Sequence, residues 1–311
     1  MKHFLSISDL VDLQKAVQEA SVLKKDPFAF EKLGKRKTIC LLFFNNSLRT
    51  RLSTQKAAQN LGLNVMVMNF GNEGWQLEFE HGVVMDSGKA EHIKEAAQVV
   101  SQYCDIVAIR AFAGLKDKEK DEREEVLTGF RQYAHIPVVN MESSTAHPLQ
   151  ALADAITIEE HKKIDRPKVV LSWAPHPKAL PHAVANSFVK MIKLQDAEFV
   201  IANPEGYDLN PEITKGCKIV HNQNEALQNA NFVYVKNWSS YSDYGKVLQV
   251  DHSWKMTLEK LKNAHFMHCL PVRRNLVMED AVLDSEQSLV IEQANNRTFA
   301  TQLVLKRLLS D

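Results

Sequence analysis

Cysteine is scarce in this chain, and the charges of its side chains cancel. Cys40, Cys104, Cys217 and Cys269 lie far apart and form no CxxC pair, so the dense spacing of a zinc site or a disulfide framework is missing. Lysine and arginine number 38 together, as do aspartate and glutamate, and the formal net charge is zero. A neutral chain has no global field to hold polyanions, which argues against partners such as nucleic acid or an anionic membrane.

Long apolar runs and the common nucleotide motifs are also missing. No stretch approaches the roughly 18 apolar residues that a membrane helix requires, and residues 1–8 resemble neither a signal peptide nor an anchor. The chain has no GxxxxGKS or GxxxxGKT loop, and no GxGxxG follows an expected strand. We therefore expect a cytoplasmic protein in a reducing compartment, with a ligand smaller than a nucleoside triphosphate or a dinucleotide.

Apolar segments typical of buried strands alternate with segments of helical periodicity along the 311 residues. This length favours about two domains, and buried strands separated by helices indicate parallel βαβ units. The sequence therefore predicts an α/β fold with two Rossmann-like parallel-sheet domains, the second beginning near residue 150. Expected strands are 38–44, 64–69, 105–110, 136–141, 168–173, 198–202, 231–235 and 264–268. Expected helices are 9–25, one ending near 62, 91–103, 148–163, 181–193 and 295–309.

Two segments interrupt this alternation, at 70–90 and 174–181. Ligands of open α/β sheets bind beyond the carboxyl ends of the strands, so we expect the chemistry near such loops. The second loop contains Pro175, Pro177 and Pro181, which restrict φ and should make it stiff. The charge run at 116–125 is typical of a solvated loop or helix face.

An anion site is indicated directly after the first expected strand. The sequence Ser47-Leu48-Arg49-Thr50-Arg51 falls at the expected first turn of a helix, where free backbone N–H groups and the helix dipole favour an anion. Two guanidinium groups and two hydroxyls beside that terminus suit a dianion. In the alternative interpretation Ser47 only caps the helix and both arginines point to solvent.

Further polar side chains occur where expected strands end or helices begin. Arg110 ends a buried strand and requires a partner there, either the same anion or a nearby carboxylate. His147 alone is as consistent with capping or packing as with binding. The remaining candidates are Gln150 in His147-Pro148-Leu149-Gln150, the sequence His268-Cys269-Leu270-Pro271 with Arg273 and Arg274 behind it, and Arg297, which opens the last expected helix.

In this order and at these separations, Ser-x-Arg-Thr-Arg, the strand-end arginine, His-Pro-x-Gln and His-Cys-Leu-Pro resemble the aspartate and ornithine carbamoyltransferase superfamily over essentially the whole chain. The resemblance implies a carbamoyl phosphate-binding domain, residues 1–147 joined by the C-terminal helix 295–311. It implies an acylornithine-binding domain over residues 148–294. It also implies a homotrimer whose active sites are shared between subunits, and a reaction without metal or cofactor.

The same resemblance assigns roles to matching residues. Ser47, Arg49, Thr50 and Arg51 would hold the phosphate, and Arg110 would bridge phosphate and carbonyl. Thr50 and His147 would polarise the carbonyl with Arg110, while Gln150 and the backbone around Leu270 would bind the carbamoyl amide. The implied carbamoyl phosphate site also includes Leu48, Trp75, Cys269 as a wall residue, and Arg297. The implied catalytic residues are Arg49, Thr50, Arg110, His147, Gln150 and Arg297.

The carbamoylated amine is indicated by the branch of the family that the chain resembles. The Ser-Met-Gly loop of ordinary ornithine carbamoyltransferases is not found, which disfavours free ornithine. Gly74-Trp75, the proline-rich loop around His176, and Lys236-Asn237-Trp238 resemble the branch that acts on N-acylated ornithine. That branch threads its proline-rich loop through a later one to form a knot, and its counterparts of Trp75 and of the loop reaching Ala90 enter the neighbouring subunit's site. Trp75 could instead pack on its own subunit.

Two positions bear on the acyl group. N-acetylornithine enzymes have Glu where this chain has Ala90 and Lys where it has Val277, whereas N-succinylornithine enzymes have Pro and an apolar residue. Val277 fits the succinyl pattern, and Ala90 departs from both but leaves room for a larger acyl group. We therefore expect N-succinyl-L-ornithine as substrate, with N-acetyl-L-ornithine as the alternative.

The substrate pocket implied by the resemblance combines residues from both halves of the chain. Lys236 would pair with a substrate carboxylate, Lys178 or Arg273 with the succinyl carboxylate, and Glu142 is a candidate to contact the reactive amine. A non-catalytic ligand-binding protein on the same fold, and catalysis in the reverse direction, remain open at this point. The full set of expected substrate-binding residues is Ala90, Phe112, Glu142, His176, Lys178, Asn186, Lys236, Leu270 and Arg273.

Overall fold

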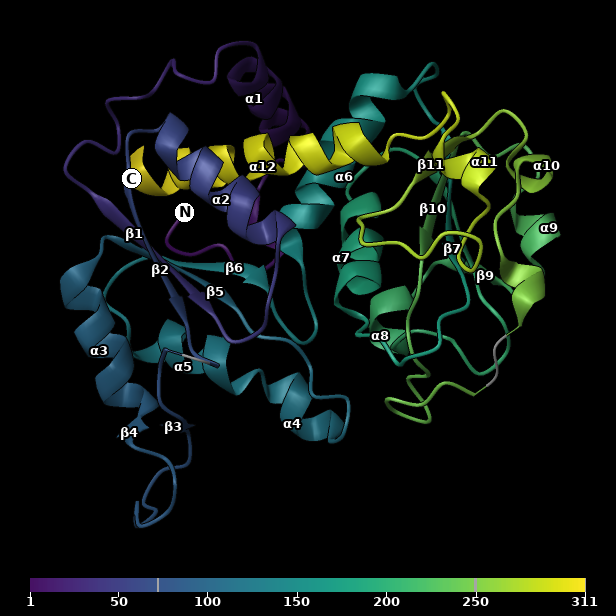
Figure 1. Cartoon of the computed structure of the whole chain (residues 1–311). Coiled ribbons are helices and arrows are strands. Elements are labelled where there is room, and N and C mark those ends of the chain that lie inside the picture. Colours follow the sequence, from purple (N-terminus) through teal and green to yellow (C-terminus); the bar gives the residue numbers. More distant parts are fainter. Residues whose placement is uncertain (72, 249–250, 311) are drawn as a thin grey trace. The chain divides into compact units, whose positions relative to one another are not determined.

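The computed structural model describes residues 1–71, 73–248 and 251–310 (Figure 1). Asn72, within the expected loop 70–90, Gln249 and Val250 in the second expected domain, and Asp311 in the expected C-terminal helix lie outside the described residues. The chain divides into two compact units. The first unit comprises residues 1–114, 118–149 and 297–311, and the second comprises residues 115–117 and 150–296.

The first unit is built on a four-stranded parallel sheet in the order β2-β1-β5-β6. Helices α1, α2 and part of α12 lie on one face of this sheet, and α3 and α5 lie on the other (Figure 1). Strand β5 is buried along its whole length, and its apolar residues pack with those of α3 and α5. The bounds are β1 Thr38–Phe43, β2 Asn64–Asn69, β5 Ile106–Arg110, β6 Val138–Glu142, α1 Leu13–Lys25, α2 Arg49–Asn60, α3 Ile93–Tyr103, α4 Lys118–Arg123 and α5 Glu125–Tyr133.

The second unit contains a five-stranded parallel sheet in the order β11-β10-β7-β8-β9. Helices α7 and α8 lie on one side of it, and α9 and α10 on the other (Figure 1). The bounds are β7 Lys168–Trp173, β8 Glu198–Ala202, β9 Lys218–Val220, β10 Phe232–Lys236, β11 His265–Met267, α7 Ala183–Ile192, α8 Pro211–Thr214, α9 Gln223–Ala226, α10 Leu258–Leu261 and α11 Asp280–Leu283. The predicted α/β fold with two parallel sheets is confirmed.

Two long helices, α6 (Pro148–His161) and α12 (Val290–Ser310), each contribute to both units. Within the second unit they are joined by buried polar side chains. Gln293 donates to Asp154 Oδ1 over 2.7 Å, and Asn296 donates to Thr157 Oγ1 over 3.0 Å. Buried polar groups need such partners, so this ladder fixes the register between the two helices.

Several expected helix boundaries were wrong. Helix α1 begins at Leu13 instead of residue 9, because Asp12 accepts the N–H of Lys15 and a short 3₁₀ turn, Ile7–Asp9, precedes it. Helix α3 begins two residues late, since Glu91–His92 pairs with Leu77–Glu78 as the strands β4 and β3. Helix α12 begins at Val290, five residues early.

The prediction that the charge run at 116–125 is a solvated loop or helix face is confirmed. The run contains the exposed helix α4, after which Glu124 adopts a left-handed backbone conformation and α5 begins at Glu125. Helix α5 has an apolar stripe that packs on the sheet through Leu127 and Phe130. The charged residues masked this stripe in the sequence.

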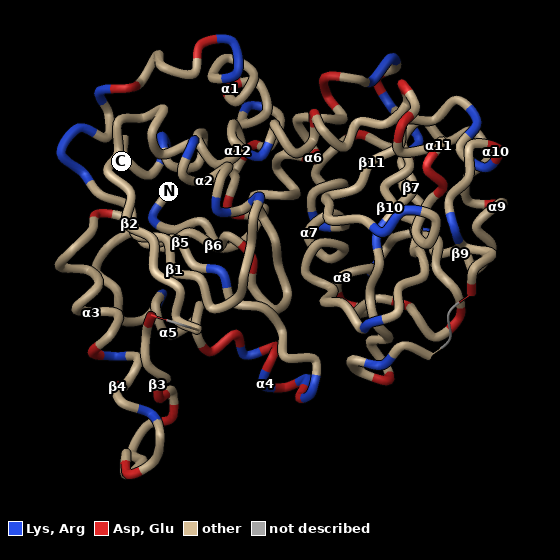
Figure 2. Tube along the Cα trace, viewed as in Figure 1, with Lys and Arg blue, Asp and Glu red and all other residues tan. Residues whose placement is uncertain are grey.

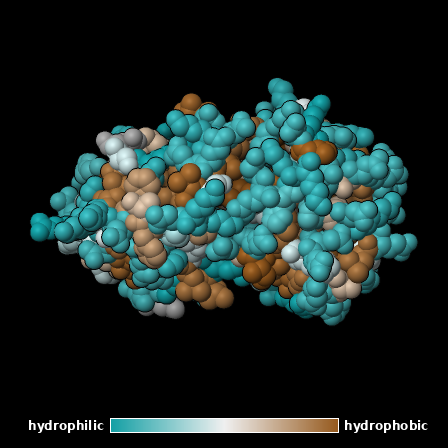
Figure 3. Space-filling model, turned by 90° about the horizontal axis from the view of Figure 1, so that it is seen from above, coloured by the Kyte–Doolittle hydropathy of each residue, from teal (hydrophilic) through white to brown (hydrophobic). Residues whose placement is uncertain are grey.

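Both signs of charge are interspersed along the whole trace (Figure 2). On the face shown in Figure 3, hydrophilic residues predominate and hydrophobic residues form separate patches. Within residues 1–71, 73–248 and 251–310, no helix combines the length and apolar character needed to cross a membrane.

Candidate active site

The start of α2 has the expected features of an anion site. The hydroxyl of Ser47 accepts the backbone N–H of Thr50 over 3.2 Å, so Ser47 does cap the helix. Arg51 does not extend into solvent, because it donates to Asn69 Oδ1 and its guanidinium lies 5.1 Å from the centroid of the Phe43 ring. Arg49, the first residue of α2, is half-buried. The terminus therefore combines helix N–H groups with the half-buried Arg49 and with Arg51, which is held against residues of the sheet.

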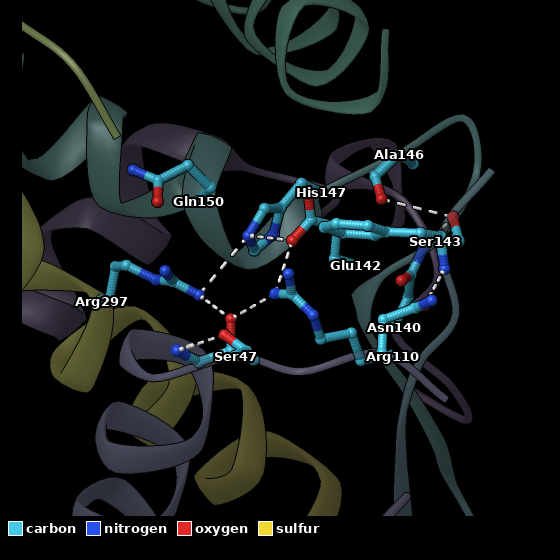
Figure 4. Close-up of polar contacts among 12 residues, drawn as sticks. Ser47, Arg110, Asn140, Glu142, Ser143, Ala146, His147, Gln150 and Arg297 are labelled. Carbon is cyan, nitrogen blue, oxygen red and sulfur yellow. Dashed lines mark hydrogen bonds and ion pairs between the residues drawn. The ribbon is translucent and has the colours of Figure 1, made fainter. Parts of the chain in front are cut away.

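The hydroxyl of Thr50 is where two guanidinium groups converge. Its Oγ1 accepts a hydrogen bond from Arg110 Nη1 over 2.9 Å and another from Arg297 Nη2 over 2.7 Å (Figure 4). All three side chains are buried, with Arg110 7% and Arg297 4% exposed. Two buried cations require compensating negative charge, so this cluster favours an anionic ligand or an acidic neighbour.

Glu142 supplies part of that charge. Its Oε2 lies 2.7 Å from Arg110 Nη1 and 3.3 Å from His147 Nε2, and Arg297 Nη2 lies 3.4 Å from the same imidazole nitrogen (Figure 4). Arg110 therefore pairs with a nearby carboxylate, as one of the two alternatives predicted, and it also belongs to the cluster around Thr50. A carboxylate held by Arg110 and His147 shows that these two groups can bind an oxyanion.

The loop after β5 is fixed against the loop after β1. Asn45 Oδ1 accepts the backbone N–H of Phe112 over 2.6 Å, and the ring of Phe112 lies 4.2 Å from the Arg110 guanidinium carbon. The aromatic face and the cation attract each other. Phe112 therefore helps to orient Arg110.

In the second unit, positively charged side chains lie at or beyond the carboxyl ends of β7, β10 and β11. Arg273 Nε donates to His176 Nε2 over 3.2 Å, and His176 Nδ1 lies 2.9 Å from the Lys178 carbonyl oxygen and 3.1 Å from the Lys178 backbone nitrogen. Burial lowers the pKa of His176, the bond to the Lys178 carbonyl opposes this, and the charges of Arg273, Lys236 and Lys178 lower it further. Three cationic side chains near this imidazole are suited to binding carboxylates.

The proline-rich loop is bonded to the loop that follows β10. Asn237 donates to the carbonyl oxygens of Ala174 and Pro175 over 2.7 and 2.9 Å, and the N–H of Ser239 donates to Leu180 over 3.0 Å. The candidate residue Asn186 is buried in α7, where its N–H bonds to the carbonyl oxygen of His182. These bonds hold the loop rigidly around its cationic residues.

Leu270 adopts a left-handed backbone conformation with φ of 54°. Its N–H donates to His268 Nδ1 over 2.9 Å, while the N–H of His268 donates to Gln293 Oε1 over 3.0 Å, and Cys269 lies between them. This conformation is costly for a residue with a Cβ and is concentrated at functional sites. The backbone around Leu270 is therefore held in a shape that the chain would not adopt unaided.

Two family models match the chain that carries this site. A model described as aspartate/ornithine carbamoyltransferase, carbamoyl-P binding domain, matches residues 2–160, and one described as aspartate/ornithine carbamoyltransferase, Asp/Orn binding domain, matches residues 181–308. The chain belongs to the aspartate/ornithine carbamoyltransferase family. The first matched stretch contains the cluster around Thr50, and the second contains Lys236, Arg273 and Arg297.

Curated relatives extend over the full chain. The N-succinylornithine carbamoyltransferase of Bacteroides thetaiotaomicron is 49% identical, with 99% of each chain covered, and that of Bacteroides fragilis is 48% identical, with 100% of this chain and 99% of the relative covered. The N-acetylornithine carbamoyltransferase of Xanthomonas axonopodis pv. citri is 33% identical, with 100% and 97% covered. N-succinylornithine and N-acetylornithine carbamoyltransferases are therefore both similar to this chain along its length.

Solved carbamoyltransferase structures share the fold. An acetylornithine transcarbamylase complexed with acetylcitrulline has a TM-score of 0.93 at 33% identity, with 99% of both chains covered. A variant of N-acetyl-L-ornithine transcarbamylase with one glutamate replaced by alanine, complexed with carbamyl phosphate and N-succinyl-L-norvaline, has a TM-score of 0.92 at 33% identity, with 99% of this chain and 100% of that chain covered. Variants with valine, proline or serine at the same glutamate have the same two ligands.

Within the family framework, the structure brings together some predicted residues and separates others. Ser47, Thr50, Arg110, Glu142, His147 and Arg297 are connected in the first unit, and His176, Lys178, Lys236 and Arg273 in the second. Gln150 belongs to the second unit and donates to Asp154 Oδ1 over 2.7 Å.

Four further predicted positions lie outside these clusters. Trp75 is 58% exposed and donates to Glu91 Oε2 over 2.8 Å, Leu48 and Ala90 are exposed, and Val277 is fully buried. Val277 therefore acts on its surroundings through packing.

Several polar residues of the site were missed. Asn45 and Asn69 hold Phe112 and Arg51, and Asn140 is fully buried in the middle of β6, where it donates to Leu5 and Ser143. The signal for these two amides was present, since Asn69 ends β2 and Asn140 interrupts the apolar residues of β6. Asn45 had no such signal, because polar residues are ordinary in loops.

Among the described residues, one group of three side chains has the ligand types and spacing for a metal ion: Glu160, His161 and Glu292 in the second unit. His161 Nε2 lies 2.5 Å from Glu292 Oε2, and Glu160 Oε2 accepts from Asn296 over 2.7 Å. These contacts account for the cluster as an ion pair and a hydrogen bond between α6 and α12.

Proposed function

We propose that this protein is an N-succinylornithine carbamoyltransferase. It transfers the carbamoyl group of carbamoyl phosphate to the side-chain amine of N-succinyl-L-ornithine, giving N-succinyl-L-citrulline and phosphate in arginine biosynthesis. The observation that carries this proposal is the convergence of Arg110 and Arg297 on the Thr50 hydroxyl beside His147, at the N-terminus of α2.

The cluster suits the charge that develops during the reaction. The amine nitrogen bonds to the carbamoyl carbon, negative charge grows on the carbonyl oxygen, and the C–O bond to phosphate then breaks with its electron pair on phosphate. The amine gives up one N–H proton, which balances overall as hydrogen phosphate. Arg110, Thr50 and His147 are the donors for the carbonyl oxygen, and Ser47, Arg49 and Arg51 with the α2 N–H groups receive the phosphate. Such preorganised donors are typically the largest single contribution to catalysis.

Glu142 has a second role in this proposal. Before substrates bind, its carboxylate is paired with Arg110 and His147. Carbamoyl phosphate brings its own negative charge to Arg110, so the carboxylate is released to contact the incoming amine. Until carbamoyl phosphate binds, the carboxylate compensates the buried guanidinium group of Arg110 and accepts the contact with the His147 imidazole.

The cations around His176 favour a succinyl over an acetyl group. A succinyl group adds a carboxylate that an acetyl group lacks, and Lys178 and Arg273 provide positive charge for it while Lys236 serves the α-carboxylate. By its resemblance, this chain has Ala90 where N-acetylornithine enzymes have a glutamate. Replacing a glutamate by alanine removes a negative charge that would repel the succinyl carboxylate.

We also infer a homotrimer with shared active sites, in the cytoplasm, and the knotted arrangement of the proline-rich loop. The exposed indole of Trp75 on the loop between β2 and α3 supports a subunit interface, and the bonds from Asn237 and Ser239 to the proline-rich loop support the threading. Light scattering should give three times the chain mass of 35.3 kDa. A monomer of full activity would contradict the shared sites.

The test of the function is a ureido-product assay with carbamoyl phosphate and, separately, ornithine, N-acetylornithine and N-succinylornithine. We expect turnover with the succinyl compound and loss of turnover in Arg49→Ala. Preference for N-acetylornithine would retain carbamoyl transfer but contradict the acyl assignment. Silence with all three amines would contradict the enzyme itself.

The acyl assignment has a matched pair of variants at one position. Ala90→Glu should lower kcat/KM for N-succinylornithine by at least about tenfold, because an added carboxylate faces the succinyl carboxylate. Ala90→Pro introduces the residue typical of N-succinylornithine enzymes and should retain the preference. Equal preferences in both variants would show that position 90 does not read the acyl group.

A further inference from the structure

Glu124 lies between helices α4 and α5 and takes part in no step described above. Its backbone is left-handed, with φ of 48° and ψ of 50°. Such a conformation costs roughly 1–2 kcal/mol for a residue with a Cβ. A glycine would adopt it without this cost, so the glutamate side chain at this position requires a separate explanation.

The carboxylate of Glu124 is bonded to the loop that leads from β6 to α6. Its Oε1 accepts hydrogen bonds from Ser143 Oγ over 2.6 Å, from the N–H of Thr145 over 2.8 Å and from Thr145 Oγ1 over 2.7 Å. Three donors of one short loop thus converge on a single oxygen. Hydrogen bonds to a charged acceptor are the strong ones, so this contact fixes the loop.

The loop itself is a closed turn with candidate active-site residues at both ends. The N–H of Ser143 donates to the carbonyl oxygen of Ala146 over 2.8 Å, and Asn140 Nδ2 donates to Ser143 Oγ over 2.9 Å (Figure 4). Glu142 directly precedes this turn and His147 directly follows it. The position of the His147 imidazole relative to Arg297 and Glu142 therefore depends on the shape of the turn.

The same corner also holds the loop that follows Arg110. Asp121 Oδ1, one turn before Glu124, accepts the backbone N–H of Gly114 over 2.7 Å. The junction of α4 and α5 thus binds the backbone on both sides of the cluster, after β5 and after β6. This gives the otherwise exposed α4 a role in the site.

We propose that Glu124 is a positioning residue for His147, and that its carboxylate holds the turn Ser143–Ala146 in the shape that carbamoyl transfer requires. This inference rests on the proposed function and adds a residue that lies outside the sequence motifs of the site. A misplacement of about 1 Å at a reacting group can cost on the order of 100-fold in rate. The left-handed backbone is tolerated because it aims the carboxylate at the turn.

Two substitutions separate the carboxylate from the backbone. Glu124→Gly suits the left-handed conformation but removes all three hydrogen bonds, and it should lower kcat at least about tenfold. Glu124→Gln keeps an acceptor oxygen and should restore kcat to within about threefold of the wild type. Glu119→Ala, which removes an exposed glutamate from α4, is the control and should leave kcat unchanged.

A double-mutant cycle with His147→Ala tests whether Glu124 acts through His147. In that background Glu124→Gly should lower kcat less than about twofold, because the imidazole that it positions is gone. An equal loss in both backgrounds would overturn the inference, since a merely structural role acts regardless of His147. Unchanged kcat in Glu124→Gly would overturn it too.

An NMR measurement makes the result independent of turnover. The ring resonance of His147, assigned by its loss in His147→Ala, should shift in Glu124→Gly and return in Glu124→Gln. If the wild type transfers no carbamoyl group but this resonance shifts, the proposed function fails and the positioning role stands. If the wild type is active and neither kcat nor the resonance changes, the positioning role alone fails.

Discussion

At the scale of single residues, Thr50 links the charged groups of the first unit. Its buried hydroxyl accepts from two guanidinium groups, Arg110 and Arg297, that would otherwise face each other without an oxygen between them. A hydroxyl can accept two hydrogen bonds and still donate its own proton. Thr50 is therefore placed to hold both arginines and to donate to a ligand oxygen.

Removing this hydroxyl should impair catalysis strongly. Thr50→Val keeps the shape of the side chain but removes the acceptor and donor, and kcat should fall about 100-fold, as for the loss of one oxyanion donor. Thr50→Ser keeps the hydroxyl and should lose far less. Steady-state kinetics with a melting curve for each variant checks this, and equal kcat values for the valine and serine variants would contradict the role of the hydroxyl.

His176 should respond to the charge of Arg273. Burial and the surrounding cations lower the pKa of this imidazole, so Arg273→Ala should raise it, as an NMR titration of the ring can measure. When folding lowers the pKa of a base, the free energy of unfolding of the protein decreases as pH falls, because the unfolded chain binds more protons. Arg273→Ala should therefore also weaken the acid sensitivity that His176 contributes.

The control for this prediction is the next residue along the chain. Arg274 is bonded to Asp280 and Asp284 and is not among the charges that act on His176. Arg274→Ala should leave the pKa of His176 in place. An equal rise in both variants would mean that disruption of the loop, and not charge, controls the imidazole.

The chemistry of the site was predictable residue by residue where side chains follow strands in recognisable order. Ser47, Thr50, Arg110 and His147 were found because their motifs mark strand ends and helix starts. Arg297 was expected to open the last helix, but it lies inside α12, which already begins at Val290. Glu124 and Asn45 were not predictable, since their roles depend on tertiary hydrogen bonds to loops 21 and 67 residues away in sequence. Sequence spacing alone holds no record of such contacts.

At the scale of elements, the strands were predicted better than the helices. Strands β2, β7 and β8 begin and end where their apolar or alternating residues do. Helix starts depend on which side chain reaches back to cap the first turn, as Asp12 does for α1. Helix α5 was missed because its apolar stripe is short and follows a dense charge run.

Gly62 lies in the turn between α2 and β2, and the backbone conformation of this turn leaves no room for a side chain. Its φ is +78°, and an added Cβ would lie 2.0 Å from the carbonyl oxygen of Glu31. Gly62→Ala should lower the free energy of unfolding by at least about 1 kcal/mol, from the backbone conformation alone, and the contact with Glu31 adds to this loss.

Gly88 provides the matched control, because an added Cβ there meets no atom within 4 Å among the described residues. Gly88→Ala should leave the free energy of unfolding nearly unchanged. Denaturant titration of both variants measures the difference. A Gly62→Ala variant as stable as Gly88→Ala would show that the turn shifts freely.

At the scale of the whole molecule, each unit supplies one part of the proposed reaction. The first unit has the arginines, threonine and histidine for a phosphate and a carbonyl, and the second has the cations for carboxylates. The family's two domain models match successive stretches of the chain in the same order. Curated relatives match along 99% or more of this chain.

The central claim is transfer of the carbamoyl group to an amine, and NMR on one reaction mixture tests it most directly. The mixture contains the protein, 13C-labelled carbamoyl phosphate and N-succinylornithine, and both the 13C and 31P signals are recorded with time. We predict that the labelled carbon moves to the ureido group and that one phosphate appears for each ureido carbon. Phosphate release without a ureido signal, or no change in either signal, would contradict the account.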